Sequence, residues 1–206
     1  MKRAIVAIAG AALCAAPAAA APPSVTLKAA PTTLTYGAAT AMSGVLSTGK
    51  TGQTVDIQGQ ECGQGAFKKV ASATTTTGGA FSASVKPAMN TAYQAKEKGS
   101  TSPTVAVKVA PVVAAKKLAR GKFSVSVTAA QSFVGKYVVF QRLRKSKWVT
   151  LKKVTLKSVA TTTAPTQVSS ATFRIKLATK LRVRAILPLP QAGSCYLAGQ
   201  SKAIRS

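Results

Sequence analysis

The sequence predicts an all-β fold, with two tandem immunoglobulin-like β-sandwich domains after an N-terminal signal peptide. Apolar and polar residues alternate over many short stretches, which is typical of strands that bury one face and expose the other. Turn residues separate these stretches, and each half of the chain holds about seven of them, as an immunoglobulin-like sandwich requires. The same order of stretches occurs twice, at a period near 90 residues. Repetition of this kind predicts two similar units in tandem.

Residues 1–20 are predicted to be a signal peptide. Lys2 and Arg3 form a short basic region before an apolar stretch that ends near residue 16. The small residues Ala18–Ala20 then suit a signal peptidase site. The apolar stretch is shorter than the roughly 20 residues that span a bilayer. We therefore expect a mature chain that begins near Ala21.

Two other ways of attaching the chain to a cell surface have weaker support in the sequence. Lipidation of Cys14 needs a small residue before the cysteine, where this chain has Leu13. The segment Leu189–Gly193 resembles a sortase signal, but no hydrophobic span and basic tail follow it. We expect a secreted, extracellular protein that is either released or held non-covalently at the cell surface, with no transmembrane segment in the mature chain.

The repeat can be followed motif by motif. Four segments of the first half each have a counterpart of similar pattern in the second half. The pairs are Gly52–Gln58 with Gly135–Gln141, Phe67–Val70 with Leu151–Val154, Phe81–Val85 with Phe173–Leu177, and Tyr93–Ala95 with Val183–Ala185.

The repeat predicts domains at residues 21–110 and 111–206, with the boundary near Pro111. A closing strand is expected over Thr104–Val109 and an opening strand over Val112–Leu118. The short linker between them predicts that the domains touch end to end. Gly78-Gly79 and Gly99-Ser100 are expected at hairpin connections.

Several short motifs recur in a known pattern. They are Gln60–Gly63, Thr74–Gly79 and Ser102–Val105 in the first half, and Gly135–Arg142, Trp148 and Cys195–Gly199 in the second. With these motifs the chain resembles secreted immunoglobulin-like repeat proteins of actinobacterial type. The motifs are structural, so the resemblance implies an extracellular sandwich fold and no particular activity.

Cys62 and Cys195 remain after removal of the signal peptide, one in each predicted domain. Cys62 follows a strand at the end of domain one where the chain exits, and Cys195 lies in a loop at the end of domain two where the chain enters. The topology therefore brings both thiols to the junction, and export permits an interdomain disulfide. Free thiols and an intermolecular bridge are the alternatives.

The composition argues against an enzyme. The chain has no histidine, which removes Ser-His and Cys-His nucleophile pairs and histidine-based zinc sites. The acidic residues are Asp56, Glu61 and Glu97, too few for a glycosidase carboxylate pair in a cleft. Asp56 alternates with two apolar neighbours and is expected on a solvated strand face. No cofactor or metal is predicted.

The formal net charge of +26 is unevenly distributed. Residues 22–110 contain 8 basic and 3 acidic residues, whereas residues 111–206 contain 19 basic and no acidic ones. A domain without acids cannot neutralise itself and carries a strong positive field. The residues predicted to bind an anionic polymer are Arg142, Arg144, Lys145, Lys147, Lys152, Lys153, Arg174, Lys176, Arg182 and Arg184.

Three kinds of partner follow from this charge and fold. The first is an anionic cell-wall polymer such as wall teichoic acid, an acidic polysaccharide or lipid headgroups, although the same charge also suits passive retention on an anionic envelope. The second is a surface protein paired along a strand edge, for which the chain is a structural spacer. Physiological nucleic acid is not expected, because Phe123, Phe140, Phe173 and Trp148 are expected in the core rather than as stacking platforms.

Overall fold

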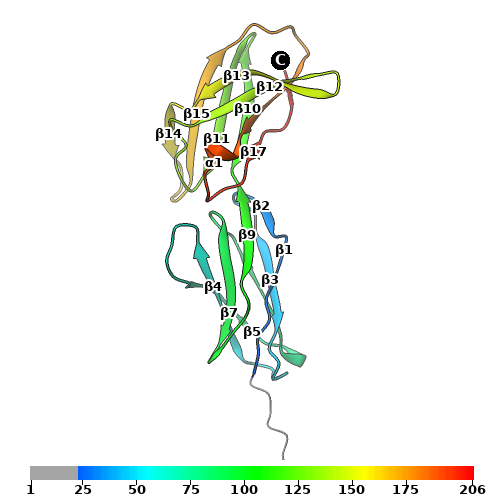
Figure 1. Ribbon diagram of the computed structural model, residues 1–206, viewed down its shortest axis with the longest axis vertical. Coiled ribbons are helices and arrows are strands. Elements are labelled where there is room, and N and C mark those ends of the chain that lie inside the picture. The colour runs from blue at the N-terminus through cyan, green and yellow to red at the C-terminus, as the bar shows by residue number, and fades with distance from the viewer. Residues whose placement is uncertain (1–22) are drawn as a thin grey trace, which may run out of the picture.

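The computed structural model describes residues 23–206. The predicted signal peptide and Cys14 lie outside the described residues. The chain forms two β-sandwiches stacked end to end, with the N-terminal one below and the C-terminal one above in Figure 1. None of the helices in residues 23–206 is long and apolar enough to cross a membrane. The predicted all-β fold with two immunoglobulin-like sandwiches is confirmed.

The N-terminal sandwich contains strands β1 to β9. One sheet has the order β1-β3-β6, and its strands are β1 (Lys28–Ala30), β3 (Thr40–Val45) and β6 (Ala80–Val85). The facing sheet has the order β2-β9-β7-β4-β5, with β8 on β7. Its strands are β2 (Thr33–Thr35), β4 (Thr54–Glu61), β5 (Lys68–Thr74), β7 (Thr91–Glu97), β8 (Ser100–Thr101) and β9 (Val105–Ala110).

The C-terminal sandwich contains strands β10 to β18 and the short helix α1 (Leu189–Ala192). One sheet has the order β10-β11-β15-β14. Its strands are β10 (Val112–Ala119), β11 (Lys122–Ala129), β14 (Ser158–Thr161) and β15 (Gln167–Arg174). The facing sheet has the order β13-β12-β16-β17, with β18 on β16. Its strands are β12 (Tyr137–Arg144), β13 (Lys147–Thr155), β16 (Arg182–Leu187), β17 (Gly199–Gln200) and β18 (Ile204–Arg205).

Each sandwich buries its own core between its two sheets. Met42, Ile57 and Tyr93 are fully or almost fully buried in the N-terminal core. The C-terminal core contains Phe123, Phe140 and Phe173, whose ring centroids lie 5.0 to 6.0 Å apart. Aromatic contacts at this distance add to the stabilisation from apolar burial. The expectation that these three phenylalanines are core residues is confirmed.

The predicted repeat is confirmed for the central strands. β4 and β12 both carry an irregular register beside the strand that follows them, after Ile57 and after Phe140. On the other side, Ile57 pairs with Ala95 on β7, and Phe140 pairs with Ala185 on β16. Two of the predicted correspondences, Gly52–Gln58 with Gly135–Gln141 and Tyr93–Ala95 with Val183–Ala185, therefore have the predicted register.

The other two correspondences join the right strands but in the wrong register. Ala71 pairs with Ile57, and Lys152 pairs with the equivalent Phe140. Ala71 of β5 therefore corresponds to Lys152 of β13, whereas the predicted alignment matched Lys152 with Lys68, three residues earlier. The bulge lies at the same place in both halves, so the difference comes from the connection between the strands. Gln58 pairs with Lys69, 11 residues later, whereas Gln141 pairs with Thr150, 9 residues later. Phe81 is the second residue of β6, while Phe173 is the seventh of β15, so these rings stand at opposite ends of their strands.

The connections were predicted with mixed success. Gly99 lies in the β7–β8 hairpin, as expected. The prediction of a hairpin at Gly78-Gly79 was wrong, because β5 and β6 belong to different sheets and the 3₁₀ turn Thr77–Gly79 carries the chain across. Gly79 has a φ of +74°, and a Cβ there would collide with the carbonyl oxygen of Leu46. This crossing therefore requires glycine.

Within residues 23–206 each sandwich has nine strands, where the sequence predicted about seven. The additional strands include β8, β17 and β18, which are two residues long. An alternation of apolar and polar residues cannot be recognised over two residues. These short strands were therefore not detected in the sequence.

Candidate interdomain junction and basic surfaces

The two sandwiches are joined by a single residue and a disulfide. β9 ends at Ala110 and β10 begins at Val112, so one strand runs almost directly into the next (Figure 1). Cys62 follows β4, and Cys195 lies between α1 and β17. The two cysteines form a disulfide with a Cα–Cα distance of 5.3 Å. The predicted interdomain bridge is confirmed.

Asn90 provides a second, non-covalent link across the junction. Its backbone N–H donates to the carbonyl of Cys195 at 2.9 Å, and its side-chain Nδ2 donates to the carbonyl of Ser194 at 3.0 Å. Its Oδ1 accepts from the backbone N–H of Val109 at 2.9 Å. Asn90 thereby satisfies backbone groups of both sandwiches at once, which helps to fix their relative orientation.

The Tyr196 side chain contacts both sandwiches at the same junction. Its ring is almost completely buried and packs edge-on against Phe133 with centroids 5.8 Å apart. Its Oη donates to the carbonyl of Ala88 at 2.9 Å and accepts from the backbone N–H of Ala130 at 3.2 Å. Burial raises the pKa of Tyr196 to about 12, because a buried phenolate loses its hydration.

The two sandwiches differ in whether their basic side chains have acidic partners. In the N-terminal sandwich, Asp56 pairs with Lys69 at 2.8 Å and accepts a hydrogen bond from Ser72. The Lys69 ammonium, followed by the Ser72 hydroxyl, lowers the pKa of Asp56. The side chain is partly exposed, as predicted. The C-terminal sandwich has no Asp or Glu side chain to form such a pair.

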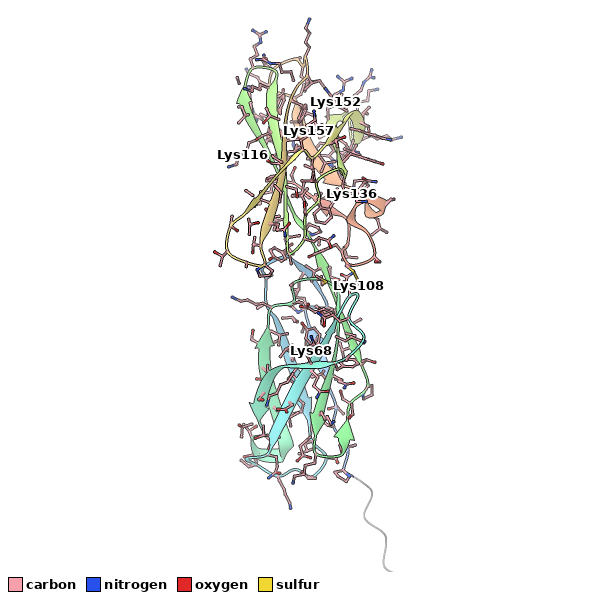
Figure 2. The ribbon with its side chains drawn as sticks, turned by 90° about the vertical axis from the view of Figure 1, so that its left-hand side faces the viewer. Lys68, Lys108, Lys116, Lys136, Lys152 and Lys157 are labelled. Carbon is pink, nitrogen blue, oxygen red and sulfur yellow. A yellow bond between two sulfur atoms is a disulfide. The ribbon has the colours of Figure 1, made fainter. Side chains whose placement is uncertain are left out.

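The basic residues of the C-terminal sandwich are spread over both sheets. Figure 2 shows Lys116, Lys136, Lys152 and Lys157 at separate places on this sandwich. The residues predicted to bind a polymer likewise divide into an outer face of one sheet and the end farthest from the junction. They do not form one continuous stripe, because the two sheets face opposite ways.

Lys153, Arg182 and Arg184 lie on the outer face of the sheet that contains β12, β13 and β16. They alternate with buried residues of their strands, which point into the core. Lys153 lies over the ring of Tyr137 with its Nζ 5.0 Å from the centroid. These residues therefore have the solvated orientation that the sequence predicted.

The remaining exposed residues of the predicted set lie at or toward the end of the sandwich farthest from the junction. Arg144, Lys145 and Lys147 belong to the β12–β13 hairpin, which projects to the side in Figure 1. Arg174 and Lys176 line a cleft of about 520 Å³ with Arg120, Gly121, Ile175 and Leu177. Lys152 lies 5.9 Å from the Phe173 ring centroid, and its Nζ is 3.5 Å from the carbonyl oxygen of Arg174.

Two side chains differ from their predicted environment. Arg142 pairs with the buried Val183 and lies on the inner side of the sheet, and its Nε is buried without a hydrogen-bond partner. It is therefore not part of a solvated face. Trp148 was expected in the core but is half-buried and absent from it. It stands on the outer face because it pairs with Leu143 at the end of the β12–β13 ladder.

Arg184 and Trp148 form the best-defined contact of the outer face. The Arg184 guanidinium carbon lies 4.1 Å from the centroid of the Trp148 ring. Its Nε donates to Oε1 of Gln141 at 3.0 Å, and its Nη1 donates to Oε1 of Gln200 at 3.1 Å. Burial lowers the pKa of Arg184, but a guanidinium remains protonated in proteins.

Residues 23–206 contain no group of three or more His, Cys, Asp or Glu side chains that could hold a metal ion. Both ion pairs of this region, Asp56–Lys69 and Glu97–Lys98, lie in the N-terminal sandwich. The distinctive chemistry of the C-terminal sandwich is therefore its unneutralised positive charge.

Comparison with known proteins does not identify a family for this chain. No protein-family model and no curated protein sequence matches the chain. Among solved structures, the chain is similar to a crystal structure of bovine butyrophilin, with 11% identity over 90% of this chain and 99% of that chain. The TM-score is 0.32, and nothing about function follows from this similarity.

Proposed function

We propose that this chain is a secreted, non-enzymatic immunoglobulin-like protein of actinobacterial type, and that its C-terminal sandwich binds anionic cell-envelope polymers. One observation carries the proposal: residues 111–206 hold 19 basic residues and no acidic one. A surface of this kind has a positive field that its own side chains cannot cancel. Counter-charge must come from outside the sandwich, and a polyanion supplies it with release of small counterions.

The exposure of the charges supports the same proposal. Of the predicted binding residues, all but Arg142 and Arg184 are exposed. The N-terminal sandwich provides the contrast, since its 8 basic residues are partly offset by 3 acidic ones. The interdomain disulfide supports export, because such bonds persist in oxidising compartments.

A structural spacer is the alternative function, and the junction is the observation that favours it. The Cys62–Cys195 disulfide and the hydrogen bonds of Asn90 hold the sandwiches end to end. An elongated unit of this kind can present a partner protein at a distance from a surface. Binding along a strand edge would depend little on salt, whereas binding through charge weakens as salt screens it.

The test is retention of the full-length, disulfide-intact chain on purified cell envelopes across a salt series. One variant changes Lys147, Lys153 and Lys176 to Gln, and a matched control changes Lys28, Lys50 and Lys86 to Gln. All six lysines are exposed, so both variants remove the same charge from the surface. We expect retention that falls steeply with salt and is reduced much more by the first variant.

Two results would contradict the proposal. Equal reduction by both variants would mean that the charge of the C-terminal sandwich has no special role. Retention that is indifferent to salt would favour the spacer, which needs a protein partner instead of a polyanion.

A further inference from the structure

The C-terminal sandwich carries an arginine face, defined by Arg182, Arg184 and Arg205 beside Trp148 on the outer side of β13, β12, β16 and β18. We propose that this arginine face is the binding site for the phosphates of a linear phosphodiester polymer without bases, such as a polyol phosphate. The proposal rests on the proposed function and gives it a place and a ligand class. Arg205 and Trp148 add to the residues that the sequence suggested for binding.

The Arg184 guanidinium is preorganised for binding an anion. Stacking on Trp148 and the hydrogen bonds to Gln141 and Gln200 fix the guanidinium in one orientation. Both hydrogen-bond partners are neutral amides, so they orient the cation without neutralising it. They use two of its five N–H groups, which leaves three for a ligand. A fixed cation loses less conformational entropy on binding than a free side chain does.

Arg182 and Arg205 face each other directly on neighbouring strands, and both are exposed. Like charges in this position destabilise a sheet. Neither has an acidic partner, since both ion pairs of residues 23–206 lie in the other sandwich. Arg184 follows Arg182 by two residues on the same side of β16, about 7 Å away by the rise of a strand. The three arginine side chains therefore extend from neighbouring positions on one face of the sheet, and their like charges repel one another until an anion binds.

Phosphate fits this arrangement better than the carboxylates of a polysaccharide. Guanidinium binds phosphate and carboxylate alike through two parallel hydrogen bonds, so the arrangement of charges along the polymer decides between them. A phosphodiester chain carries a charge at every backbone linkage, so it can supply neighbouring anions to neighbouring arginines. A polysaccharide carries its carboxylates on rigid sugar rings, so successive carboxylates point to different sides of the chain and turn less readily together toward one protein face.

The aromatic residues of this sheet face argue against a nucleic acid. Single-stranded nucleic acids bind by stacking bases on open aromatic rings. Here the Trp148 ring is half-buried and covered by Arg184, and the Tyr137 ring is approached by Lys153. The rings are already engaged by cations, so the face offers charge without a stacking platform.

Trp148 is the sole tryptophan of the chain, so its fluorescence reports on this face. The experiment titrates the full-length, disulfide-intact protein with purified poly(glycerol phosphate) teichoic acid, polygalacturonate and single-stranded DNA. We expect a saturable change of Trp148 emission with teichoic acid at the lowest concentration of the three. Loss of two charge-assisted contacts in the double variant Arg182→Gln/Arg205→Gln should weaken binding about tenfold or more.

The matched control is the double variant Lys116→Gln/Lys157→Gln, which removes the same charge from exposed positions at the other sheet of the C-terminal sandwich. It should weaken binding by less than about threefold, because it reduces only the general field. Removing the repulsion between Arg182 and Arg205 should also raise the thermal stability of the unliganded protein slightly. That gain shows that the variant folds and that the two charges do repel each other.

The outcomes separate the site from the proposed function. Equal weakening by both double variants, or saturation of binding without a change in Trp148 emission, would overturn the arginine face and leave polymer binding elsewhere on the sandwich. Tighter binding of DNA or polygalacturonate would overturn the ligand class. Absence of binding to all three polymers, and to envelopes, would overturn the proposed function together with this site.

Discussion

The two sandwiches share one backbone contact but differ in the length of the connection that provides it, where β7 meets β8 and where β16 meets β17. In both, a serine hydroxyl accepts from the backbone N–H of an alanine on the preceding strand at 2.9 Å: Ser102 from Ala95, and Ser201 from Ala185. Each hydroxyl also donates to the next backbone carbonyl. The serine follows its alanine by 7 residues in the N-terminal sandwich and by 16 in the C-terminal one.

The longer connection explains how a repeated sandwich becomes part of a two-domain unit. Its additional residues form α1 and carry Ser194, Cys195 and Tyr196, which supply most of the contacts across the junction. In the N-terminal sandwich the corresponding connection is the tight β7–β8 hairpin, which lies at the end of that sandwich far from the junction. The scaffold is therefore shared, and the features specific to the second sandwich lie in one loop and on its surface.

The disulfide should have the largest effect on this arrangement. Cys62 and Cys195 are 133 residues apart in sequence, so replacing both by Ser should lower the free energy of unfolding by up to about 5 kcal/mol in the chain-entropy model. We expect the two sandwiches then to unfold in separate transitions, because only the peptide chain at residue 111 still links them covalently. Denaturant unfolding measures the free energy of unfolding, and calorimetry measures the number of transitions. A single transition of unchanged midpoint would show that the bridge contributes little to stability or coupling.

The shared serine contact provides a matched test of the repeat. Ser102→Ala and Ser201→Ala each remove the acceptor for a buried alanine N–H, which should destabilise the protein by roughly 1–3 kcal/mol. We expect losses of similar size in the two sandwiches, measured by denaturant unfolding. A loss in one sandwich alone would mean that the two contacts are not equivalent despite their common geometry.

Asn90→Ala tests the junction without touching either core. It removes the side-chain bond to Ser194 and the acceptor for the N–H of Val109. We expect a loss of about 1–2 kcal/mol and faster hydrogen exchange at Val109. Gln60→Ala is the control, since it removes an exposed bond to Gln64 and should change stability by less than about 0.5 kcal/mol. Similar losses in the two variants would contradict the role given to Asn90.

The smallest effect at neutral pH is expected for Tyr196→Phe, about 0.5–1.5 kcal/mol from its lost hydrogen bonds. Its pKa is raised from an ordinary value of 10.0 to about 12. Above pH 10 the unfolded chain releases this proton first, so stability is fully present below that pH and is lost as pH rises toward about 12. The variant should show a shallower loss over this window.

Tyr93 limits how much the Tyr196→Phe substitution can reduce the loss of stability at alkaline pH. Burial raises its pKa to about 12 as well, so a decline with pH should remain in the Tyr196→Phe variant. Unfolding curves at several alkaline pH values measure the slope. An identical slope in the variant and the parent chain would show that Tyr196 does not titrate on unfolding as its burial implies.

Much of the fold could be predicted because it depends on local alternation and on topology. Alternation identified the strands around Val55 and Val183, and the repeat placed Cys62 and Cys195 at one junction. Register was lost where the two halves differ in the length of a connection, as before Lys152. Local alternation does not contain this information, because the pairing of two strands is fixed by the turn that joins them.

The candidate site was harder to predict because its residues meet across strands. Gln200 and Arg205 lie in two-residue strands with no detectable periodicity. The contact of Arg184 with Trp148 depends on the pairing of β13, β12 and β16. The charge that attracts a ligand is visible in the sequence, but the geometry that selects it is visible only in the folded sheet.

Amide hydrogen exchange of the full-length protein, with and without poly(glycerol phosphate) teichoic acid, tests the account most directly. It maps binding over the whole chain in one measurement and needs no variant. We expect added protection in β12, β13, β16 and β18, with the N-terminal sandwich unchanged. Protection spread evenly over both sandwiches, or confined to residues 23–110, would contradict the claim that the C-terminal sandwich is the polymer-binding part of the molecule.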